Sequence, residues 1–170
     1  AAAATDEIVY LNIFEGLTKF KEDGSIVPAL AYKWDIDKSG LIYKFFINNN
    51  VKFHDGKQMN AFDVEFSLNR ARGENSTNAQ KPLFESIETI KVINKYLLEI
   101  KLKYPESNFL TNLAWGDAVI VSKNNITKIE TNPIGTGPFK FFKWVKGDKV
   151  VLIKNKEYWG KEIFLEKAIF

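Results

Sequence analysis

The chain has 170 residues, of which 45% are hydrophobic and 14% aromatic, which is enough apolar material for a globular core. Its 24 Lys and Arg residues against 21 Asp and Glu residues leave a formal charge of +3, and the basic residues are scattered rather than clustered, so nucleic-acid binding is excluded. The sequence holds no cysteine, which excludes disulfides, thiolate metal sites and a cysteine nucleophile.

The N-terminal segment predicts a helix followed by a turn. Thr5 can cap a helix that runs through Phe14, and Gly16 can end it. The polar run 21–25 predicts a turn between this segment and the next. The apolar stretch 26–31 that follows has a helix-like pattern.

The stretch 41–56 carries strong local signals for strands and turns. Residues 41–47 alternate with a period of two, in aromatic and β-branched residues, and predict a strand against a core. Three consecutive asparagines at 48–50 predict a turn, because asparagine tolerates the left-handed backbone region. Residues 51–53 predict a second, short strand, and 54–56 predict a further turn.

A helix is predicted directly after this turn. Asn60 is placed to cap a helix that begins at Ala61, and Asp63 complements the helix dipole. The run VKFHDGKQMNAFDVEFSLNRAR, residues 51–72, resembles the signature of the family 5 extracellular solute-binding proteins. These are the dipeptide, oligopeptide and nickel receptors of ABC importers, and the pattern is long and therefore specific.

The rest of the chain predicts two hairpins separated by a helix and loops. We expect a polar loop at 73–81, then a hairpin from 86–93 and 96–103. A helix should follow Pro105 and end near Trp115 and Gly116, before a short strand at 118–122 and a crossing segment at 123–132. A second hairpin from 139–146 and 149–154 and a last strand at 167–170 complete the prediction.

Further motifs resemble the same family. IFEGL at 13–17 resembles its YEGL segment in the ligand-binding lobe, NPIGTGPF at 132–139 resembles its PVGTGPY loop, and residues 155–160 follow its N..YWG pattern. The resemblance implies ligand contacts at Glu15, Gly16, Trp115, Gly116, Asp117, Thr136 and Gly137.

Several of these residues also have a purely structural interpretation. Taken without the family, Glu15 is a surface carboxylate near a helix end. Trp115 completes the apolar face of its predicted helix as readily as it lines a ligand wall. Glycines on both sides of Thr136 let the backbone approach another chain or a ligand closely, and a plain turn explains them equally well.

No enzyme chemistry is predicted from these residues. The single histidine, His54, lies beside Asp55, and we interpret it as a turn or surface residue because a catalytic triad needs partners that converge on one imidazole. The sequence holds no nucleophile elbow and no phosphate-binding glycine loop, and one histidine is too few for a metal site. We therefore predict no catalytic residue, no metal and no cofactor.

The predicted architecture is mixed α/β. The resemblance implies a type II periplasmic-binding-protein-like lobe, built discontinuously from 1–20 and 123–170, with an inserted β-rich subdomain at 21–122 and without the C-terminal lobe. The function implied is that of a substrate-binding protein that captures di- or oligopeptides in a cleft between two lobes and delivers them to an ABC permease in the membrane. The alternatives are a nickel, haem or sugar receptor of the same family, or a self-standing protein-interaction module on the same scaffold.

The resemblance also implies a location and an assembly state. It implies a protein that is periplasmic or extracellular, with a lipid anchor in the cell membrane as one form of attachment. It also implies a monomer when the protein is full length. No apolar run approaches the roughly 18 residues needed to span a bilayer, and we find no signal peptide in this chain. If the protein is exported, we expect this chain to be a mature or trimmed form.

Overall fold

The structure is a computed structural model that describes residues 9–170. The predicted cap at Thr5 lies outside the described residues, and residues 9–13 are helical, as expected for the end of the first predicted helix. The strands form three antiparallel sheets. In spatial order these are β1 (Thr18–Phe20) and β2 (Ile26–Pro28); β3 (Ala31–Ile36), β4 (Ile42–Ile47), β6 (Leu97–Leu102) and β5 (Ile87–Asn94); and β7 (Phe139–Val145), β8 (Lys149–Lys154) and β9 (Lys167–Ile169).

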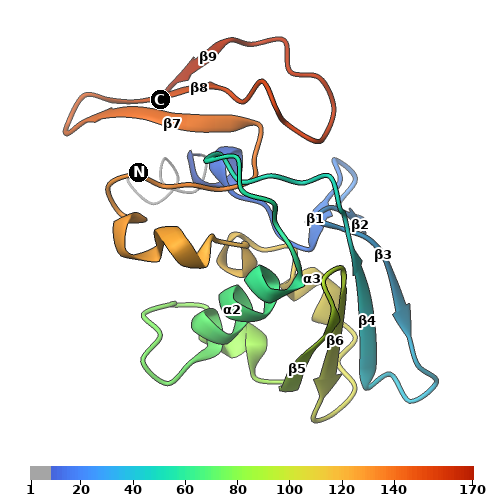
Figure 1. Cartoon of the computed structure of the whole chain (residues 1–170). Helices are drawn as coiled ribbons and strands as arrows, with labels where there is room; N and C mark the ends of the chain where they lie inside the picture. The colour runs from blue at the N-terminus through green and yellow to red at the C-terminus, as the bar shows by residue number, and fades with distance from the viewer. Residues whose placement is uncertain (1–8) are drawn as a thin grey trace.

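Helices are short in this chain. The named ones are α2 (Ala61–Arg72), α3 (Phe109–Asn112) and the 3₁₀ helices η1 (Lys81–Phe84), η2 (Gly116–Ala118) and η3 (Lys123–Lys128). Figure 1 shows the β7–β9 sheet at one end of the molecule and the β3–β6 sheet with α2 and α3 at the other, with the first helical segment between them. Within residues 9–170, no helix is both long and apolar enough to cross a membrane.

The strand β4 forms where the alternating pattern predicted it. Successive side chains of a strand point to opposite faces, so Tyr43, Phe45 and Ile47 enter the core while Lys44 faces solvent. β4 is a central strand, paired on one side with β3 and on the other with β6. Its buried residues share the larger of two hydrophobic cores with Val64 and Leu68 of α2.

The start of α2 is held by the predicted cap. The Asn60 side chain accepts a hydrogen bond from the N–H of Phe62 at 2.9 Å, and the Asp63 carboxylate accepts one from the N–H of Asn60 at 3.0 Å. The two bonds make a reciprocal capping box, which satisfies N–H groups that have no partner within the helix. The helix ends at Arg72, before Gly73, and the loop predicted at 73–81 follows.

The smaller core lies between the first helical segment and the third sheet. Ile13 and Phe14 pack there with Phe139 of β7 and Leu152 of β8. The hairpin of β7 and β8 was predicted, and Gly147 at its turn has a φ of +77°, a conformation that favours glycine. This core joins the N-terminal segment to the end of the chain, and Glu15 directly follows Phe14 of this core.

Four predictions of secondary structure were wrong. The helix-like stretch 26–31 forms β2 and the start of β3, because its backbone pairs with β1 and β4. Residues 51–53 form only an isolated bridge, Lys52 with Gln58. The apolar run 118–122 is buried but forms no strand, since its N–H groups bond to the Glu15 carbonyl and the Ser67 hydroxyl instead of a neighbouring ladder. The helix expected to run from Pro105 to near Trp115 and Gly116 is confined to Phe109–Asn112.

Candidate functional site

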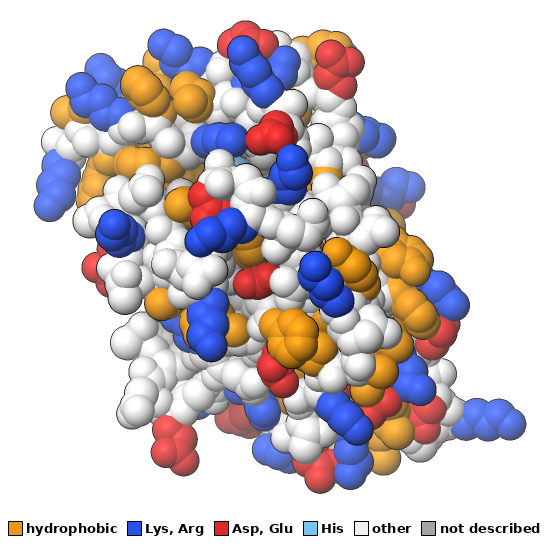
Figure 2. Space-filling view, in the orientation of Figure 1, with side chains coloured by type: hydrophobic (Ala, Val, Ile, Leu, Met, Phe, Trp, Pro, Cys, Tyr) orange, Lys and Arg blue, Asp and Glu red, His pale blue; other side chains and the backbone are white. Residues whose placement is uncertain are grey.

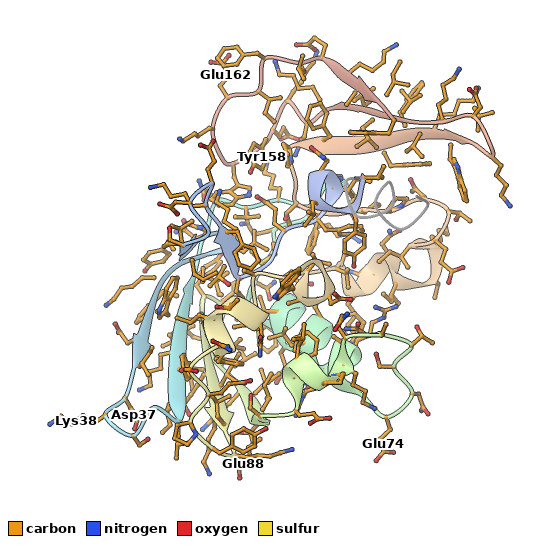
Figure 3. The ribbon with its side chains drawn as sticks, turned by 180° about the vertical axis from the view of Figure 1, so that it is seen from behind. Asp37, Lys38, Glu74, Glu88, Tyr158 and Glu162 are labelled. Atoms are coloured by element: carbon orange, nitrogen blue, oxygen red, sulfur yellow. The ribbon has the colours of Figure 1, made fainter. Side chains whose placement is uncertain are left out.

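Glu15 is the centre of a cluster of polar side chains from three distant segments. Its carboxylate accepts hydrogen bonds from the Thr136 hydroxyl at 2.9 Å, the Tyr158 hydroxyl at 2.8 Å and the Trp159 indole N–H at 2.8 Å. Figure 3 labels Tyr158 near the start of β7, where the segment after β8 returns to the middle of the molecule. Glu15 and Thr136, two of the predicted ligand contacts, therefore contact each other directly in the structure.

Burial shifts the electrostatics of this cluster. It raises the pKa of Glu15, and the hydrogen bonds from Trp159, Tyr158 and Thr136, together with the charge of Lys19, oppose that rise. Burial and the nearby Glu15 charge raise the pKa of Tyr158, so its hydroxyl keeps its proton and donates. Among residues 9–170, no Lys or Arg forms an ion pair with Glu15. The carboxylate is thus held by neutral donors.

The glycines beside Thr136 are needed for close backbone packing. A Cβ on Gly135 would lie 2.0 Å from the Ile13 carbonyl oxygen, and one on Gly137 would lie 2.6 Å from the Asn12 carbonyl oxygen. The N–H of Gly137 donates to the Ile13 carbonyl at 2.9 Å. The segment that the glycines approach is therefore the end of the first helical segment. Thr136 and Gly137 are buried in this chain.

Two residues outside the predicted set hold the same loop. The Nδ1 atom of His54 accepts a hydrogen bond from the N–H of Gly135 at 3.3 Å, and its Nε2 atom lies 3.0 Å from the Gly137 carbonyl oxygen. The buried Asn155 side chain donates to the same carbonyl at 3.1 Å. His54 does lie in a turn, as predicted, but it is partly buried and contacts a loop more than 80 residues away.

Trp115, Gly116 and Asp117 lie beside the first helical segment rather than against the Thr136 loop. The Trp115 ring is 46% exposed and meets Phe20 edge to face with centroids 5.5 Å apart, so it is not a core residue. A Cβ on Gly116 would touch Leu11 and Tyr10 at 3.8 Å. Leu11 and Phe20 are exposed as well, and with Trp115 they form a group that we call the apolar wall.

Gly16 connects this wall to the Glu15 cluster. A Cβ on Gly16 would lie 2.7 Å from the Leu113 carbonyl oxygen, and the Glu15 carbonyl accepts the N–H of Ile120 at 2.9 Å. The backbone after Glu15 therefore packs closely on the segment that carries Trp115. Glycine is required at this position because any side chain would collide with backbone.

A polar cavity of about 470 Å³ adjoins Asp117. It is lined by Tyr10, Arg70 and Asp117 together with the loop after α2. Burial, with the charge of Asp117 adding to it, raises the pKa of Tyr10 to about 12 against the opposing charge of Arg70. In the part of the chain that the structure describes, no group of three or more His, Cys, Asp or Glu residues is placed to hold a metal ion.

A second, larger hollow of about 720 Å³ lies between the first helical segment and the third sheet. It is mostly apolar, with Ile13, Phe141 and Trp144 among its lining residues. Figure 2 shows hydrophobic side chains gathered below the β7–β9 sheet in this region. This face of the third sheet is therefore only partly covered within the described residues.

A mixed α/β scaffold that sets a partly buried polar cluster beside an exposed apolar wall is suited to binding a small solute. The chain belongs to the bacterial extracellular solute-binding proteins of family 5, since the model described as "Bacterial extracellular solute-binding proteins, family 5 Middle" matches residues 25–170. This membership confirms the resemblance that the run at 51–72 predicted.

Three relatives illustrate the likeness. The chain is 34% identical over 157 residues to the glutathione-binding protein GsiB of Pectobacterium atrosepticum, and the alignment covers 90% of this chain and 30% of that protein. The periplasmic binding protein DppA of Helicobacter pylori, solved with the peptide STSA, matches with a TM-score of 0.83 and 33% identity over 93% of this chain and 36% of that one. NikZ of Campylobacter jejuni, solved with Ni(L-His), matches with a TM-score of 0.84 and 32% identity over 94% of this chain and 33% of that one.

These matches confirm the predicted periplasmic-binding-protein-like fold. The names of these relatives describe proteins that bind solutes. The chain spans about a third of the length of the relatives it matches.

Proposed function

We propose that this chain is part of a substrate-binding protein of an ABC importer, which captures peptides in a cleft between two lobes and delivers them to a membrane permease. Family membership, a glutathione-binding relative and a peptide-bound structure of similar fold support the proposal. The observation that carries it is the state of Glu15, a partly buried carboxylate that accepts hydrogen bonds from neutral side chains.

A carboxylate has about four lone-pair positions, and the three donors around Glu15 use three of them. One acceptor position remains for a ligand, which would also meet the negative charge of the ionised form. Peptides supply N–H donors along the main chain and an ammonium at one end, and hydrogen bonds to an ionised acceptor are about twice as strong as neutral ones. Glu15 therefore suits the main chain or the amino end of a peptide.

Thr136 and Gly137 serve the same site indirectly. Both are buried, so neither offers a free surface to a ligand in this chain. Thr136 instead orients the Glu15 carboxylate, and Gly137 lets its loop approach closely enough to do so. We assign the apolar wall of Leu11, Phe20 and Trp115 to a side chain of the bound peptide, with Gly16, Gly116 and Asp117 along its edge.

The wider context of the site forms part of the same proposal. We propose a ligand-binding lobe made of 1–20 and 123–170 with 21–122 as its inserted subdomain. The smaller core joins Ile13 and Phe14 to Phe139 and Leu152 across that lobe, although Val119 and Val121 also belong to it and Leu17 belongs to the larger core. A second lobe would close over Glu15 by a hinge when peptide binds, because the ligand favours the closed state only if it binds that state better. We place the complete receptor outside the cytoplasmic membrane as a monomer, with a lipid anchor as one form of attachment.

The likeness to NikZ supports a second candidate, a receptor for a nickel–amino acid complex. Such a ligand brings its own metal ligands, so it needs less from the protein than a bare ion does. The exposed Trp115 and the Glu15 charge would then face the chelate instead of a peptide.

The test is titration of the 170-residue chain, and of any longer chain that contains it, with the tetrapeptide STSA, glutathione and nickel with L-histidine. Binding is measured by calorimetry and by tryptophan fluorescence, since Trp159 donates to Glu15 and reports on the site. We expect the peptides to bind and Glu15→Gln to weaken them by about tenfold or more, because truncating a charged hydrogen bond costs on the order of 1.5–3 kcal/mol.

Glu162→Gln is the matched control, because Glu162 is an exposed carboxylate on the loop between β8 and β9. This variant removes the same charge from the chain without changing the Glu15 cluster, so its affinity for the peptides should equal that of the wild type. Equal losses in both variants would mean that only net charge matters. Binding of the nickel complex alone would replace the peptide proposal by the second candidate.

A further inference from the structure

His54 contacts the loop around Thr136 on both sides. Besides the two ring contacts, its main-chain N–H donates to the Gly135 carbonyl at 2.9 Å, and its own carbonyl accepts from the Lys140 ammonium at 3.0 Å. One residue thus bonds to Gly135 and Gly137, the neighbours of the threonine that donates to Glu15. His54, which the sequence predicts to be a turn or surface residue, therefore acts as a clamp on the Gly135–Gly137 loop.

The pattern of these bonds defines the tautomer of the ring. Nδ1 can accept from the Gly135 N–H only if it carries no proton, so the proton of the neutral ring lies on Nε2. That proton is then donated to the Gly137 carbonyl. A doubly protonated ring would direct an Nδ1 proton at the Gly135 N–H, replacing an attraction with a repulsion. The clamp therefore works only with neutral histidine.

We propose that neutral His54 is a positioning residue for the Glu15 cluster: it fixes the Gly135–Gly137 loop so that Thr136 can orient Glu15, and its protonation releases the loop and with it Glu15. The inference rests on the proposed function for the role of Glu15. It adds a residue that the family resemblance did not supply as a ligand contact, and it makes solute binding dependent on pH.

The groups around the His54 ring shift its pKa in both directions. Burial is the largest effect and lowers the pKa of His54 to about 4; the Gly137 carbonyl and Asp55 oppose that fall, and Lys140 on β7 adds to it. Glu157 lies on the segment after β8, where the charge of Lys140 reaches it. Glu15 stands across Thr136 from the ring. The buried Asn155 beside Gly137 is neutral and does not titrate.

The sign of the pH effect follows from the lowered value. In an opened loop His54 regains its ordinary pKa near 6.5, so the open form binds more protons than the closed form between pH 6.5 and 4. Acidification from pH 6.5 to 4 therefore raises the equilibrium constant for loop opening by on the order of a hundredfold. Glu15 acts in the opposite sense, because its pKa is raised in the closed form. A Glu15→Gln background isolates the contribution of His54.

The first test is nitrogen-15 NMR of the imidazole, which is unambiguous because the chain has one histidine. At pH 7 we expect the tautomer with the proton on Nε2, and a midpoint near 4 rather than 6.5. Exchange of the Gly135 amide, corrected for its intrinsic rate, should accelerate on the order of a hundredfold from pH 6.5 to 4. A proton on Nδ1, or a midpoint near 6.5, would overturn the inference.

The second test separates positioning from simple support of the fold. The probe is the tetrapeptide STSA, which has no side chain that titrates between pH 4 and 7. The control is His54→Gln, whose amide can still donate toward the Gly137 carbonyl but cannot take up a proton. The apparent affinity of the wild type, relative to that of the variant, should fall about twofold by pH 4, where half of the histidine rings are protonated.

The second test distinguishes a failure of the His54 inference from a failure of the proposed function. A constant affinity ratio between the two proteins from pH 7 to 4 contradicts the inference. Failure of both proteins to bind STSA at any pH counts against the proposed function, while the tautomer, the midpoint and the Gly135 exchange still decide whether His54 clamps the loop. Loss of folding in His54→Gln is checked by circular dichroism, and His54→Asn, whose side-chain oxygen can replace Nδ1, then takes its place.

Discussion

Gly135→Ala tests whether the loop around Thr136 depends on backbone contact with the first helical segment. The new Cβ would stand 2.0 Å from the Ile13 carbonyl oxygen and 2.8 Å from the Phe14 ring. A carbon–oxygen contact normally lies near 3.3 Å, so the loop must retreat by about 1 Å. The obstacle is backbone rather than the flexible end of a side chain, so the helix cannot give way instead.

The retreat of the loop breaks identifiable hydrogen bonds. The Gly137 N–H would lose the Ile13 carbonyl, Thr136 would lose Glu15, and the Gly135 N–H would lose His54. At about 1 kcal/mol each, the free energy of unfolding should fall by about 3 kcal/mol. A loss of this size lies at the upper end of the range that is typical when a core is overpacked.

Urea denaturation followed by tryptophan fluorescence measures this loss, with the m-value as a check that both proteins unfold in one step. Gly116→Ala is the matched control, because its Cβ would meet only the Leu11 and Tyr10 side chains at 3.8 Å, and it should stay within about 0.5 kcal/mol of the wild type. If Gly135→Ala is as stable as Gly116→Ala, the close contact does not support the loop and the reasoning fails.

Four more predictions concern separate parts of the molecule. Asn60→Ala removes the cap of α2 and should cost about 1 kcal/mol in urea denaturation. Phe45→Ala empties the centre of the larger core and should cost about 3–5 kcal/mol, enough to lower the melting temperature measured by calorimetry by many degrees. Trp115→Ala should change stability by less than about 0.5 kcal/mol, since the ring is exposed, yet weaken STSA binding in calorimetry. Because the pKa of Glu15 is raised in the folded state, its stabilising contribution is complete below its unfolded value near 4.5 and is lost as the pH rises through its folded value. Denaturation from pH 4 to 7 should therefore show the stability of the wild type falling relative to that of Glu15→Gln, since the opposite contribution of His54 is common to both proteins.

Local elements were predictable where the signal was contained in a few residues. The alternation of 42–47 and the pairing of Asn60 with Asp63 are short-range patterns, and both formed as predicted. The stretch 26–31 misled because a short apolar run has no period long enough to separate helix from strand. Its state is decided by pairing with β1 and β4, which is information about distant residues.

The composition of the Glu15 cluster could not be predicted from such patterns. Glu15 meets Thr136, Tyr158 and Trp159 across 121, 143 and 144 residues of sequence. Periodicity reports which side chains are buried but not which of them meet. Tyr158 and Trp159 belong to a family pattern that implies no role for them. The residues next to His54 in the sequence predict only a turn, since its partners Gly135 and Gly137 lie more than 80 residues away.

The long sequence separations within the cluster couple binding to folding. The Glu15 cluster comes from three distant segments, so it exists only when the lobe that carries them is folded. The free energy that stabilises the lobe therefore also stabilises the cluster. A ligand that binds only the folded state adds about 2.7 kcal/mol at a hundredfold excess over its dissociation constant. That gain nearly equals the cost expected for Gly135→Ala. If the displaced loop of Gly135→Ala can still close on Glu15, saturating peptide should therefore restore most of the lost free energy of unfolding. If the Glu15 cluster is the binding site and the loop cannot close, peptide should leave that loss unchanged.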